Sequence, residues 1–509
     1  MTEERAQKLG KRLKKIAYPR LLDYQWLKSQ RIFDILLATL GILLIGLFLF
    51  LYPGDPRAGN MILFSVIFIG SFLLVAKYHH YQLTIILVAS SISLILAYLL
   101  LEEFRTHGWS RIIYDYMEWE VLAVVFGMSI LVEATSETGL FDWVIIRMLK
   151  ISKGNIFPLF ALTFLLTFSL STVLANVTAM ILVSSMILTV CNGLDYDPTP
   201  FLLSAVMATS LAGMATLVSS LPTIMVGSSA AGNIGFIDFI LISVPFLIIT
   251  IPITILYLKR AFPAADIPLG NVSKNGIDKE MILSLDEWGV VEDCRKFYLA
   301  ALSLALTVVG FILSQPLDIY LDIYLPIGVI AILGGILAII LTRSDERQLI
   351  RGLSWDALLF FAGLFILVGT LEDTHVLEDI AKWLLDISGG NLFFAGILIL
   401  IIASLVSGVL DNIPVTAALI PVVADINELP AAANNPRFLW FILIFAGAFG
   451  GGLTPFGSAA SILAISILMK EGQTLDFKYF MVRLVPISLI LLVFSGIYLS
   501  IFAFVLGVI

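Results

Sequence analysis

A series of long apolar segments constrains this chain more than any other feature. Segments such as 83–101, 237–258 and 480–502 are almost entirely apolar, and each approaches or exceeds the roughly 20 residues with which a helix crosses a bilayer. Only 13% of the 509 residues are charged, against about 25% in a typical soluble domain. The sequence therefore predicts an all-α polytopic membrane protein.

The apolar segments and their basic flanks predict eleven membrane crossings. Two further apolar pairs, 157–190 and 392–423, are interpreted as re-entrant hairpins, because full crossings would partly swap the basic loops between the two sides. Basic residues up to Arg31 place the N-terminus in the cytoplasm, and the acidic segment 371–386 is expected outside. The crossings are expected at residues 32–51, 61–76, 83–101, 119–135, 201–227, 237–258, 297–313, 321–341, 355–370, 438–469 and 480–502.

The chain is divided into four parts on this basis: 1–58, a cytoplasmic basic N-terminus with the first transmembrane helix; 59–260, a first repeat with hairpin 157–190; 261–296, a cytoplasmic linker; and 297–509, a second repeat with hairpin 392–423. The basic N-terminal segment is interpreted as a solvated or membrane-surface helix, without a signal-peptide cleavage site and without a nucleic-acid partner. We expect an integral protein of the plasma (inner) membrane of a prokaryote.

The two halves of the chain repeat in one constant register, in which position 355 matches position 119. Shared Leu and Ile would be expected between any two apolar sequences, but shared Trp, Gly, Ser and Asn in one register would not. The matched pairs include Trp119 with Trp355, Gly127 with Gly363, Asn176 with Asn412 and, after a shift of two residues, Thr216 with Thr454. Each repeat holds five crossings and a hairpin, and an odd number of crossings reverses direction. The repeats are therefore predicted to be inverted, with both hairpin tips near the membrane midplane.

Four polar segments, 171–178, 213–227, 407–416 and 447–458, interrupt the apolar spans at repeat-related positions. Irregular backbone at membrane depth is tolerated only where it is buried in protein or lines a wet cavity, and broken helices expose groups that coordinate ions or oxyanions. Close helix packing is the alternative role for such small residues. The candidate ion- or substrate-binding residues are Asn176, Thr178, Thr216, Ser219, Ser220, Asp411, Asn412, Thr416, Thr454 and Ser458.

Asp411 is the most informative single residue among them. A charged group at the centre of a membrane helix costs at least ~2.5–3.5 kcal/mol, which favours a function over a purely structural role. The alternative is that Asp411 only caps the returning helix, and the two roles are compatible. Asn176, Asp411 and Asn412 are the candidate sodium ligands. Glu120 and Asp356 are interpreted as helix-start residues that interact with the helix dipole or cap the helix.

These motifs resemble the ion transporter superfamily, which carries the citrate-transporter-like domain, and within it the branch of arsenite permeases, NhaD-type sodium/proton antiporters and P proteins. The resemblance covers residues from Met61 onward and rests on Phe126-Gly127-Met128, Leu174-Ala175-Asn176-Val177-Thr178, Ala215-Thr216-Leu217, Leu410-Asp411-Asn412-Ile413-Pro414 and Leu453-Thr454-Pro455-Phe456-Gly457-Ser458. It implies a scaffold domain, often dimeric, and a transport domain that carries both hairpins and moves as an elevator.

The resemblance also bears on the substrate. Asp411-Asn412 is similar to the antiporter and P-protein form of the second hairpin, whereas arsenite permeases tend to have two Asn. Ser219-Ser220-Leu221-Pro222-Thr223 stands where relatives often have Gly-Asp-Pro-Pro-Asn, and Ala175 stands where a polar or acidic residue is common. The spans up to Leu101 and from Phe297 to Leu341 lack deep polar interruptions and are assigned to the scaffold.

The preferred hypothesis is a secondary active ion transporter that exchanges sodium for protons by alternating access, with Asp411 as the shared carboxylate. It needs no cofactor beyond the sodium ion or proton, and a homodimer is expected. The alternatives are a permease for arsenite, another inorganic anion or a carboxylate, and, from another class, an ion channel. An enzyme is not expected, since Gly-x-Ser-x-Gly, His-Glu-x-x-His and a pair of intramembrane Asp residues are all absent.

Overall fold

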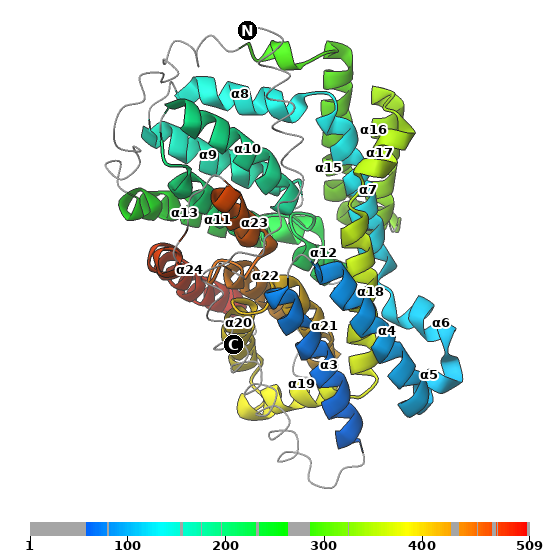
Figure 1. The fold of residues 1–509 in the computed structure, drawn as a ribbon. Coiled ribbons are helices and arrows are strands. Elements are labelled where there is room, and N and C mark those ends of the chain that lie inside the picture. Colours follow the sequence, from blue (N-terminus) through cyan, green and yellow to red (C-terminus); the bar gives the residue numbers. More distant parts are fainter. Residues whose placement is uncertain are drawn as a thin grey trace. The chain divides into compact units, whose positions relative to one another are not determined.

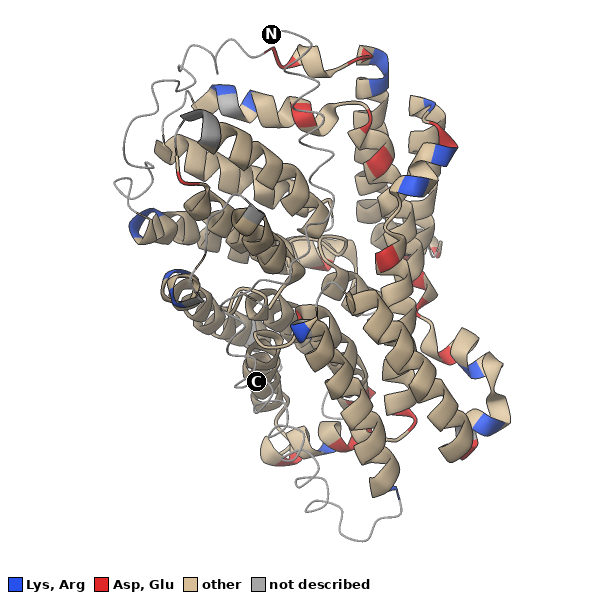
Figure 2. Cartoon of the chain, viewed as in Figure 1, with Lys and Arg blue, Asp and Glu red and all other residues tan. Residues whose placement is uncertain are grey.

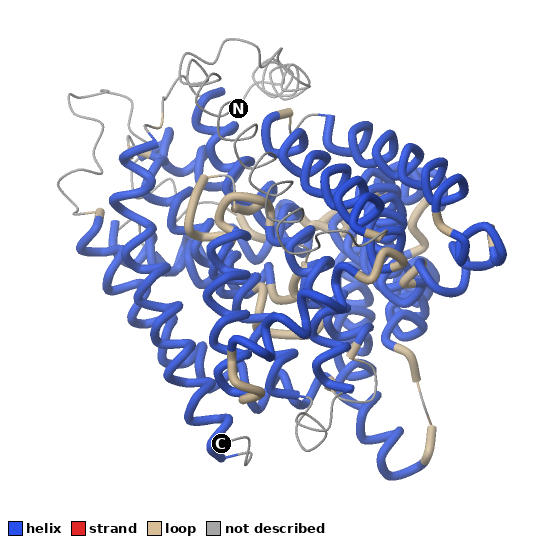
Figure 3. Tube along the Cα trace, turned by 90° about the horizontal axis from the view of Figure 1, so that it is seen from below, coloured by secondary structure: helices blue, strands red, loops and turns tan. Residues whose placement is uncertain are grey.

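The computed structural model describes residues 57–78, 81–152, 156–174, 176–194, 196–230, 234–262, 286–323, 325–428, 437–455, 457–470, 475 and 477–505. The predicted first crossing, 32–51, lies outside these residues. The chain divides into two units, Met1–Val66 and Ile67–Ile509, and every described helix except α3 (Ala58–Lys77) lies wholly in the second. The described residues form helices and no strand (Figure 3), as expected for an all-α protein.

The helices of the second unit follow one another in the order shown in Figure 1. The first half contains α4 (Gln82–Leu100), α5 (Glu102–His107), α6 (Trp109–Arg111), η3 (Ile112–Tyr116), α7 (Trp119–Ser136), α8 (Leu140–Ser152), α9 (Ile156–Ser171), α10 (Asn176–Leu194), α11 (Pro198–Ala212), α12 (Leu221–Ser229) and α13 (Phe236–Ala261). The second half contains η4 (Trp288–Val290), α15 (Cys294–Leu321), α16 (Ile327–Thr342), α17 (Glu346–Gly352), α18 (Trp355–Glu372), α19 (Val376–Ile387), α20 (Leu392–Ser407), α21 (Asn412–Glu428), α22 (Arg437–Gly450), α23 (Ala459–Lys470) and α24 (Phe477–Val505).

Seven of the described helices, α3, α4, α7, α13, α15, α18 and α24, are long and apolar enough to cross a membrane, or up to eight spans if the bent pair α19–α20 counts as one. Six more apolar helices are shorter: α9, α10, α11, α16, α22 and α23. Charged residues gather mainly toward helix ends and connecting segments (Figure 2). The protein is therefore a polytopic membrane protein, and the count of eleven crossings stays a prediction.

The helix boundaries recur along the chain in the register found in the sequence. The helices α7, α9 and α10 begin at positions 119, 156 and 176, and α18, α20 and α21 begin at the matching positions 355, 392 and 412. The short helices α12 and α23 follow breaks at related positions and begin at 221 and 459. The two halves thus contain the same succession of helices around each hairpin. Their inversion relative to each other stays a prediction.

Helices α7 and α16 pack so closely that their backbones touch. A Cβ atom on Gly127 would collide with the carbonyl carbon of Ala331, and one on Gly335 would lie 2.8 Å from the carbonyl oxygen of Gly127. Small residues allow this approach in membrane helices, where dispersion contacts drive association. Helix α4 packs against α18, where Ser93 and Thr370 share a hydrogen bond of 2.7 Å between their hydroxyls.

Helices α11 and α22 are enclosed on all sides. Every residue of α11, and every residue of α22 after Arg437, is buried, as expected for helices that are apolar all round. Aromatic rings from α13 and α24 pack onto α22; the ring centroids of Phe246 and Phe445 lie 5.0 Å apart. By contrast, α13 and α24 each expose an apolar face that suits contact with lipid, for example at Leu241 and Val493. The helix that directly follows each hairpin therefore forms the core.

Two amphipathic helices were not expected from the sequence. The sequence indicates only an acidic outer segment at 371–386, but this segment forms most of α19 (Val376–Ile387), whose axis turns by 119° into α20. Its counterpart α8 leads into α9 and is held by Glu287, which accepts hydrogen bonds from Arg147 at 2.8 Å and from Lys150. The ring of Trp143 of α8 also packs in a tilted arrangement against that of Trp288, at a centroid distance of 5.6 Å. The segment before α15, at residues 287 and 288, is thus held against α8 by these contacts.

Glu120 stabilises a helix start, but not that of its own helix. Its Oε1 accepts a hydrogen bond of 2.8 Å from the backbone N–H of Ile327, the first residue of α16. The expectation that Glu120 serves the beginning of its own span was therefore incomplete, because the free N–H groups of a helix can be satisfied from a neighbouring element. This bond adds to the glycine contacts that join α7 to α16.

Candidate functional site

Helices α9 and α10 form hairpin 1, and α20 and α21 form hairpin 2. The tip of hairpin 1 is closed by a hydrogen bond between its two arms. Helix α9 ends at Ser171 and α10 begins at Asn176. The Ser171 hydroxyl donates to Asn176 Oδ1 at 2.6 Å. Thr178 lies half-buried in the first turn of α10. Asparagine at a helix start is favoured because its side chain can satisfy groups that the helix leaves unpaired.

The break between α11 and α12 lies against this tip. Thr216 Oγ1 donates to the backbone carbonyl of Thr172 at 2.9 Å. The hydroxyls of Ser219 and Ser220 both donate to the carbonyl of Gly213, at 2.9 and 3.0 Å. Ser220 also caps α12. The structure therefore brings Thr216, which the sequence selected, to hairpin 1, while Ser219 and Ser220 mainly shape the break.

The second half repeats this arrangement. Thr454 Oγ1 donates to the backbone carbonyl of Gly408, at the tip of hairpin 2. Ser458 accepts a hydrogen bond of 3.2 Å from the backbone N–H of Ser461, and the hydroxyl of Ser461 donates back to the carbonyl of Gly451 at 3.5 Å. Ser458 therefore occupies at the start of α23 the place that Ser220 occupies at the start of α12.

The tip of hairpin 2 differs from that of hairpin 1 in its unpaired oxygens. Ser407 Oγ, Asp411 Oδ1 and Thr416 Oγ1 are buried and have no hydrogen-bond partner among the described residues. The backbone N–H groups of Asn412 and Ile413, at the start of α21, lie close to the Asp411 carboxylate. Asn412 itself is half-buried. Each buried polar atom without a partner costs free energy, of the order of 1–3 kcal/mol, and three at one tip could be satisfied by an ion or by ordered water.

Helix α22 gathers two of these oxygens on one face. A Cβ atom on Gly450 would collide with Ser407 Oγ, and one on Gly447 would lie 3.1 Å from Thr416 Oγ1. Residues three apart on a helix are neighbours on its surface, with about 5–6 Å between them. The hydroxyls of Ser407 and Thr416 therefore lie close together beside α22, with Asp411 between them in the sequence.

The two sets of site residues belong to elements that pack across the repeats. Helix α12 contacts α21 of hairpin 2, and α23 contacts α10 of hairpin 1. At the centre, a Cβ atom on Gly447 would lie 3.9 Å from Pro222 Cβ as well as near Thr416. The residues selected from the sequence thus form two groups, one at each tip, and neighbouring helices connect them.

An acidic cavity lies beside hairpin 2 and was not found from the sequence. It has a volume of about 60 Å³ and is bordered by η3, α12, α18 and α21. Three carboxyl-bearing residues, Asp115, Glu118 and Glu372, line it together with Ala417 and Ile420 of α21. Asp115 and Glu118 are neighbours in the sequence, but Glu372 lies far from them, so only the tertiary structure brings all three acids together. Carboxylates on the walls of a cavity raise the local concentration of cations.

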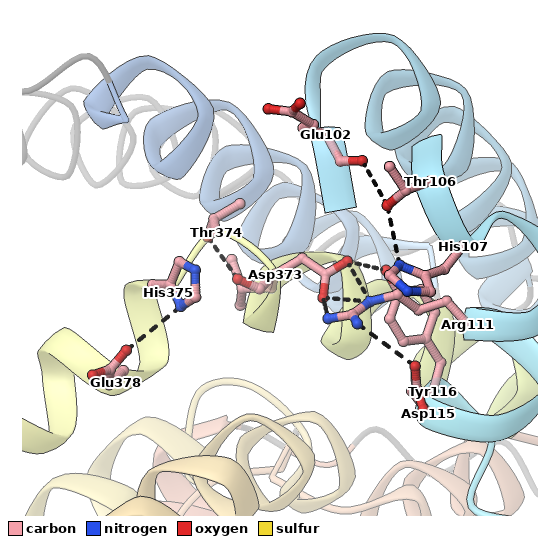
Figure 4. Close-up of polar contacts among 11 residues, drawn as sticks. Glu102, Thr106, His107, Arg111, Asp115, Tyr116, Asp373, Thr374, His375 and Glu378 are labelled. Carbon is pink, nitrogen blue, oxygen red and sulfur yellow. Dashed lines mark hydrogen bonds and ion pairs between the residues drawn. The ribbon is translucent and has the colours of Figure 1, made fainter. Parts of the chain in front are cut away.

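A buried ion pair fixes the segment that carries η3 (Figure 4). Arg111 donates to both oxygens of Asp373, with a distance of 2.6 Å from Nη2 to Oδ1, and the Tyr116 hydroxyl donates to the same carboxylate. Burial, and then the neighbouring Asp373, raise the pKa of the Tyr116 hydroxyl, which stays protonated. This network joins the segment before α7 to the end of α18.

The described residues contain no cluster of three or more His, Cys, Asp or Glu that could hold a metal ion. The oxygens at hairpin 2 are instead a carboxylate and two hydroxyls. Oxygen ligands suit hard cations, and broken membrane helices supply further carbonyl oxygens for sodium ions or protons.

Comparison with known proteins identifies the family. The sequence profile of the citrate transporter family, CitMHS, matches residues 66–446. An uncharacterised transporter of Mycobacterium tuberculosis is 30% identical over 390 residues, which cover 77% of this chain and 87% of that protein. The P protein of Mus musculus is 27% identical over 459 residues, which cover 77% of this chain and 55% of that protein.

A solved structure shares the fold. The YdaH transporter of Alcanivorax borkumensis, whose topology is described as unusual, aligns with a TM-score of 0.54 and 15% identity. The alignment covers 79% of this chain and 89% of that one. The family profile matches more than half of the length of this chain. The chain therefore belongs to the citrate transporter (CitMHS) family of membrane transporters.

Proposed function

We propose that this transporter is a secondary active antiporter that exchanges sodium for protons, and that both ions compete for the tip of hairpin 2. The observation that carries the proposal is the set of buried, unpartnered oxygens of Ser407, Asp411 and Thr416. A sodium ion would satisfy all three at once. A proton on Asp411 would satisfy the carboxylate alone, so each ion excludes the other.

The acidic cavity supports a cation over an anion as the ion that reaches this tip. Asp115, Glu118 and Glu372 line it, and no Lys or Arg among the described residues does. Burial raises the pKa of Glu118, so an anionic substrate would meet the full negative charge of this cavity only as the pH rises through that raised pKa. We extend the proposal to alternating access by movement of the two hairpins, to inverted repeats and to a homodimer; the shared order of helices around each hairpin supports the repeat.

A carboxylate such as citrate is the second candidate substrate, because the family profile carries the description of a citrate transporter. The helix starts at Asn176 and Asn412 lie at the two tips, and free N–H groups at a helix start bind anions. In that case the cation at hairpin 2 would be the coupling ion, and the anion would lie between the tips.

Flux measurements on the purified protein in liposomes test the proposal. An imposed sodium gradient should drive proton movement, read by a pH-sensitive dye, and Asp411→Asn should abolish it while leaving insertion and purification unchanged. Asp197→Asn is the matched control, since Asp197 caps α11 away from both tips. Undiminished exchange by the Asp411→Asn variant would remove this carboxylate from the mechanism. Citrate uptake without sodium-driven proton movement would favour the second candidate.

A further inference from the structure

The tips of the two hairpins share a serine and an asparagine at matching positions but differ in their other oxygen-bearing side chains. In the register that matches position 355 to position 119, Ser407 corresponds to Ser171 and Asn412 to Asn176. The other two oxygen-bearing residues of hairpin 2 lack counterparts. Ala175 stands in the sequence at the position of Asp411, and Met180 at that of Thr416. Hairpin 1 therefore lacks the carboxylate and the hydroxyl at these two register positions, and its own hydroxyl in the first turn of α10, that of Thr178, matches Pro414 in hairpin 2.

The serine hydroxyl that both tips share, at Ser171 and Ser407, has a hydrogen-bond partner at only one of them. In hairpin 1 the Ser171 hydroxyl is bonded to Asn176 Oδ1 at 2.6 Å, so it is not available to a ligand without breaking that bond. In hairpin 2 the hydroxyl of Ser407 has no partner among the described residues. No described residue of the hairpin 1 tip has a buried side-chain oxygen in that condition.

The side chains around the tips follow this difference. Met180 is fully buried, so an apolar thioether fills the place that the Thr416 hydroxyl takes in hairpin 2. After the hairpins the register is shifted by two residues, as in the match of Thr216 with Thr454. In this shifted register Thr209 of α11 corresponds to Gly447 of α22. The Thr209 hydroxyl is satisfied by the carbonyl of Val206 at 2.8 Å. At the tip of hairpin 1 Ser171 and Thr209 are therefore satisfied within the protein, whereas Ser407, Asp411 and Thr416 at hairpin 2 each keep an unpartnered oxygen.

We infer that each protomer binds a single cation, at hairpin 2, and that hairpin 1 is a tip without a cation, whose Ser171–Asn176 bond keeps its shape. This inference rests on the proposed function and specifies its stoichiometry. Ser407 and Thr416 are direct ligands in this assignment, with Asp411 as the charged one. Sodium dependence of transport should then show no cooperativity within a protomer.

Equilibrium binding of radioactive sodium to the purified full-length protein in detergent tests the inference. We expect one sodium ion bound per protomer. Ser407→Ala and Thr416→Val should each weaken the affinity by roughly tenfold or more, as expected for loss of a ligand that contributes about 1.4 kcal/mol. Ser171→Ala is the matched control at the same register position and should leave both the affinity and the number of ions unchanged. Size-exclusion profiles establish that each variant is folded.

The outcomes separate this inference from the proposed function. Absence of sodium binding to the unaltered protein would remove the proposed function itself. Two sodium ions per protomer, one of them lost in Ser171→Ala or Asn176→Ala, would leave sodium transport standing and overturn the single-site inference. A single ion that is lost in Ser171→Ala and retained in Ser407→Ala would place the site at hairpin 1 and would also overturn it.

Discussion

Thr216 donates its hydroxyl hydrogen to the backbone carbonyl of Thr172, at 2.9 Å, across 44 positions of the chain. The equivalent bond in the second half joins Thr454 to Gly408. Each bond fastens the break in one helix to the tip of the preceding hairpin. Since a hydrogen bond contributes a net of about 0.5–1.5 kcal/mol, these two position the tips and supply only a small part of the total stability.

Loss of either threonine hydroxyl should impair transport more than folding. We expect Thr216→Val and Thr454→Val each to lower the free energy of unfolding by about 1 kcal/mol and to reduce ion flux several-fold, because the tip carbonyl loses its donor. Thr→Ser at each position keeps the hydroxyl and should restore most of the flux. Flux in liposomes and the melting temperature in detergent measure the two effects. A Val variant with normal flux would show that the tip is held by other contacts.

The Glu287 contacts predict a specific dependence of stability on pH. Hydrogen bonds from Lys150 and then Arg147 help to lower the pKa of Glu287 from its ordinary 4.5 to about 2. A carboxyl with a depressed pKa in the folded state stabilises the protein above its unfolded pKa, and this stabilisation is lost as the pH falls through the folded pKa. The melting temperatures of the unaltered protein and of Glu287→Gln should therefore differ most above pH 4.5 and converge toward pH 2. Glu292→Gln, at an exposed residue of the same segment, should show no such convergence.

The ion pair between Arg111 and Asp373 should be more important for stability than exposed charges nearby. The Asp373 side chain is only 2% exposed, against 25% for Arg111. Removing one partner of a buried pair costs about 3–5 kcal/mol, and the partial exposure of Arg111 reduces this figure. Arg111→Met should lower the melting temperature clearly, whereas Arg105→Met, at an exposed position, should not. The double variant Arg111→Met/Asp373→Leu should recover part of the loss. Equal melting temperatures for Arg111→Met, Arg105→Met and the double variant would show that the Arg111–Asp373 pair does not stabilise the protein.

Cysteine labelling tests the predicted orientation. Cys294 is exposed and Cys191 is buried, so the protein carries one natural reporter. With the N-terminus in the cytoplasm, an impermeant maleimide should label Cys294 only in inside-out vesicles. Asp386→Cys in a Cys294→Ser background should be labelled from outside in intact cells, since residue 386 is exposed on α19. The reverse pattern would invert the topology.

The sequence predicted the hairpins because short apolar arms flank a polar tip in both halves. The continuous apolar pattern of the returning arms resumes only at Ala179 and Val415, whereas the helices begin at Asn176 and Asn412. The reason is local: Thr178 and Pro414 were counted with the tip, although polar residues and proline are favoured in the first turn of a helix. Ends of helices depend on such capping, which an apolar pattern does not record.

Other features needed the tertiary structure. The apolar face of α19 is buried at Val376, Leu377, Ala381 and Leu384. The charged residues Glu378, Asp379 and Lys382 interrupt this pattern in the sequence, so the helix was not predicted. The sequence selected Asp411 and Thr416 but missed Ser407, because a serine in a membrane helix normally satisfies itself on a nearby carbonyl. Only the packing of α22 against hairpin 2 shows that this hydroxyl is left without a partner.

The contact between α7 and α16 provides a fixed reference for measuring motion in this transporter. The backbones approach so closely at Gly127 and Gly335 that these two helices are expected to move as one unit. Helix α7 is followed by α8 and then by hairpin 1, and the turn between α7 and α8 contains Gly139 at a φ of 76°. Displacement of hairpin 1 relative to α16 would have to be absorbed at or beyond that turn. Spin labels on α16 and α9 would report it directly as a change in distance.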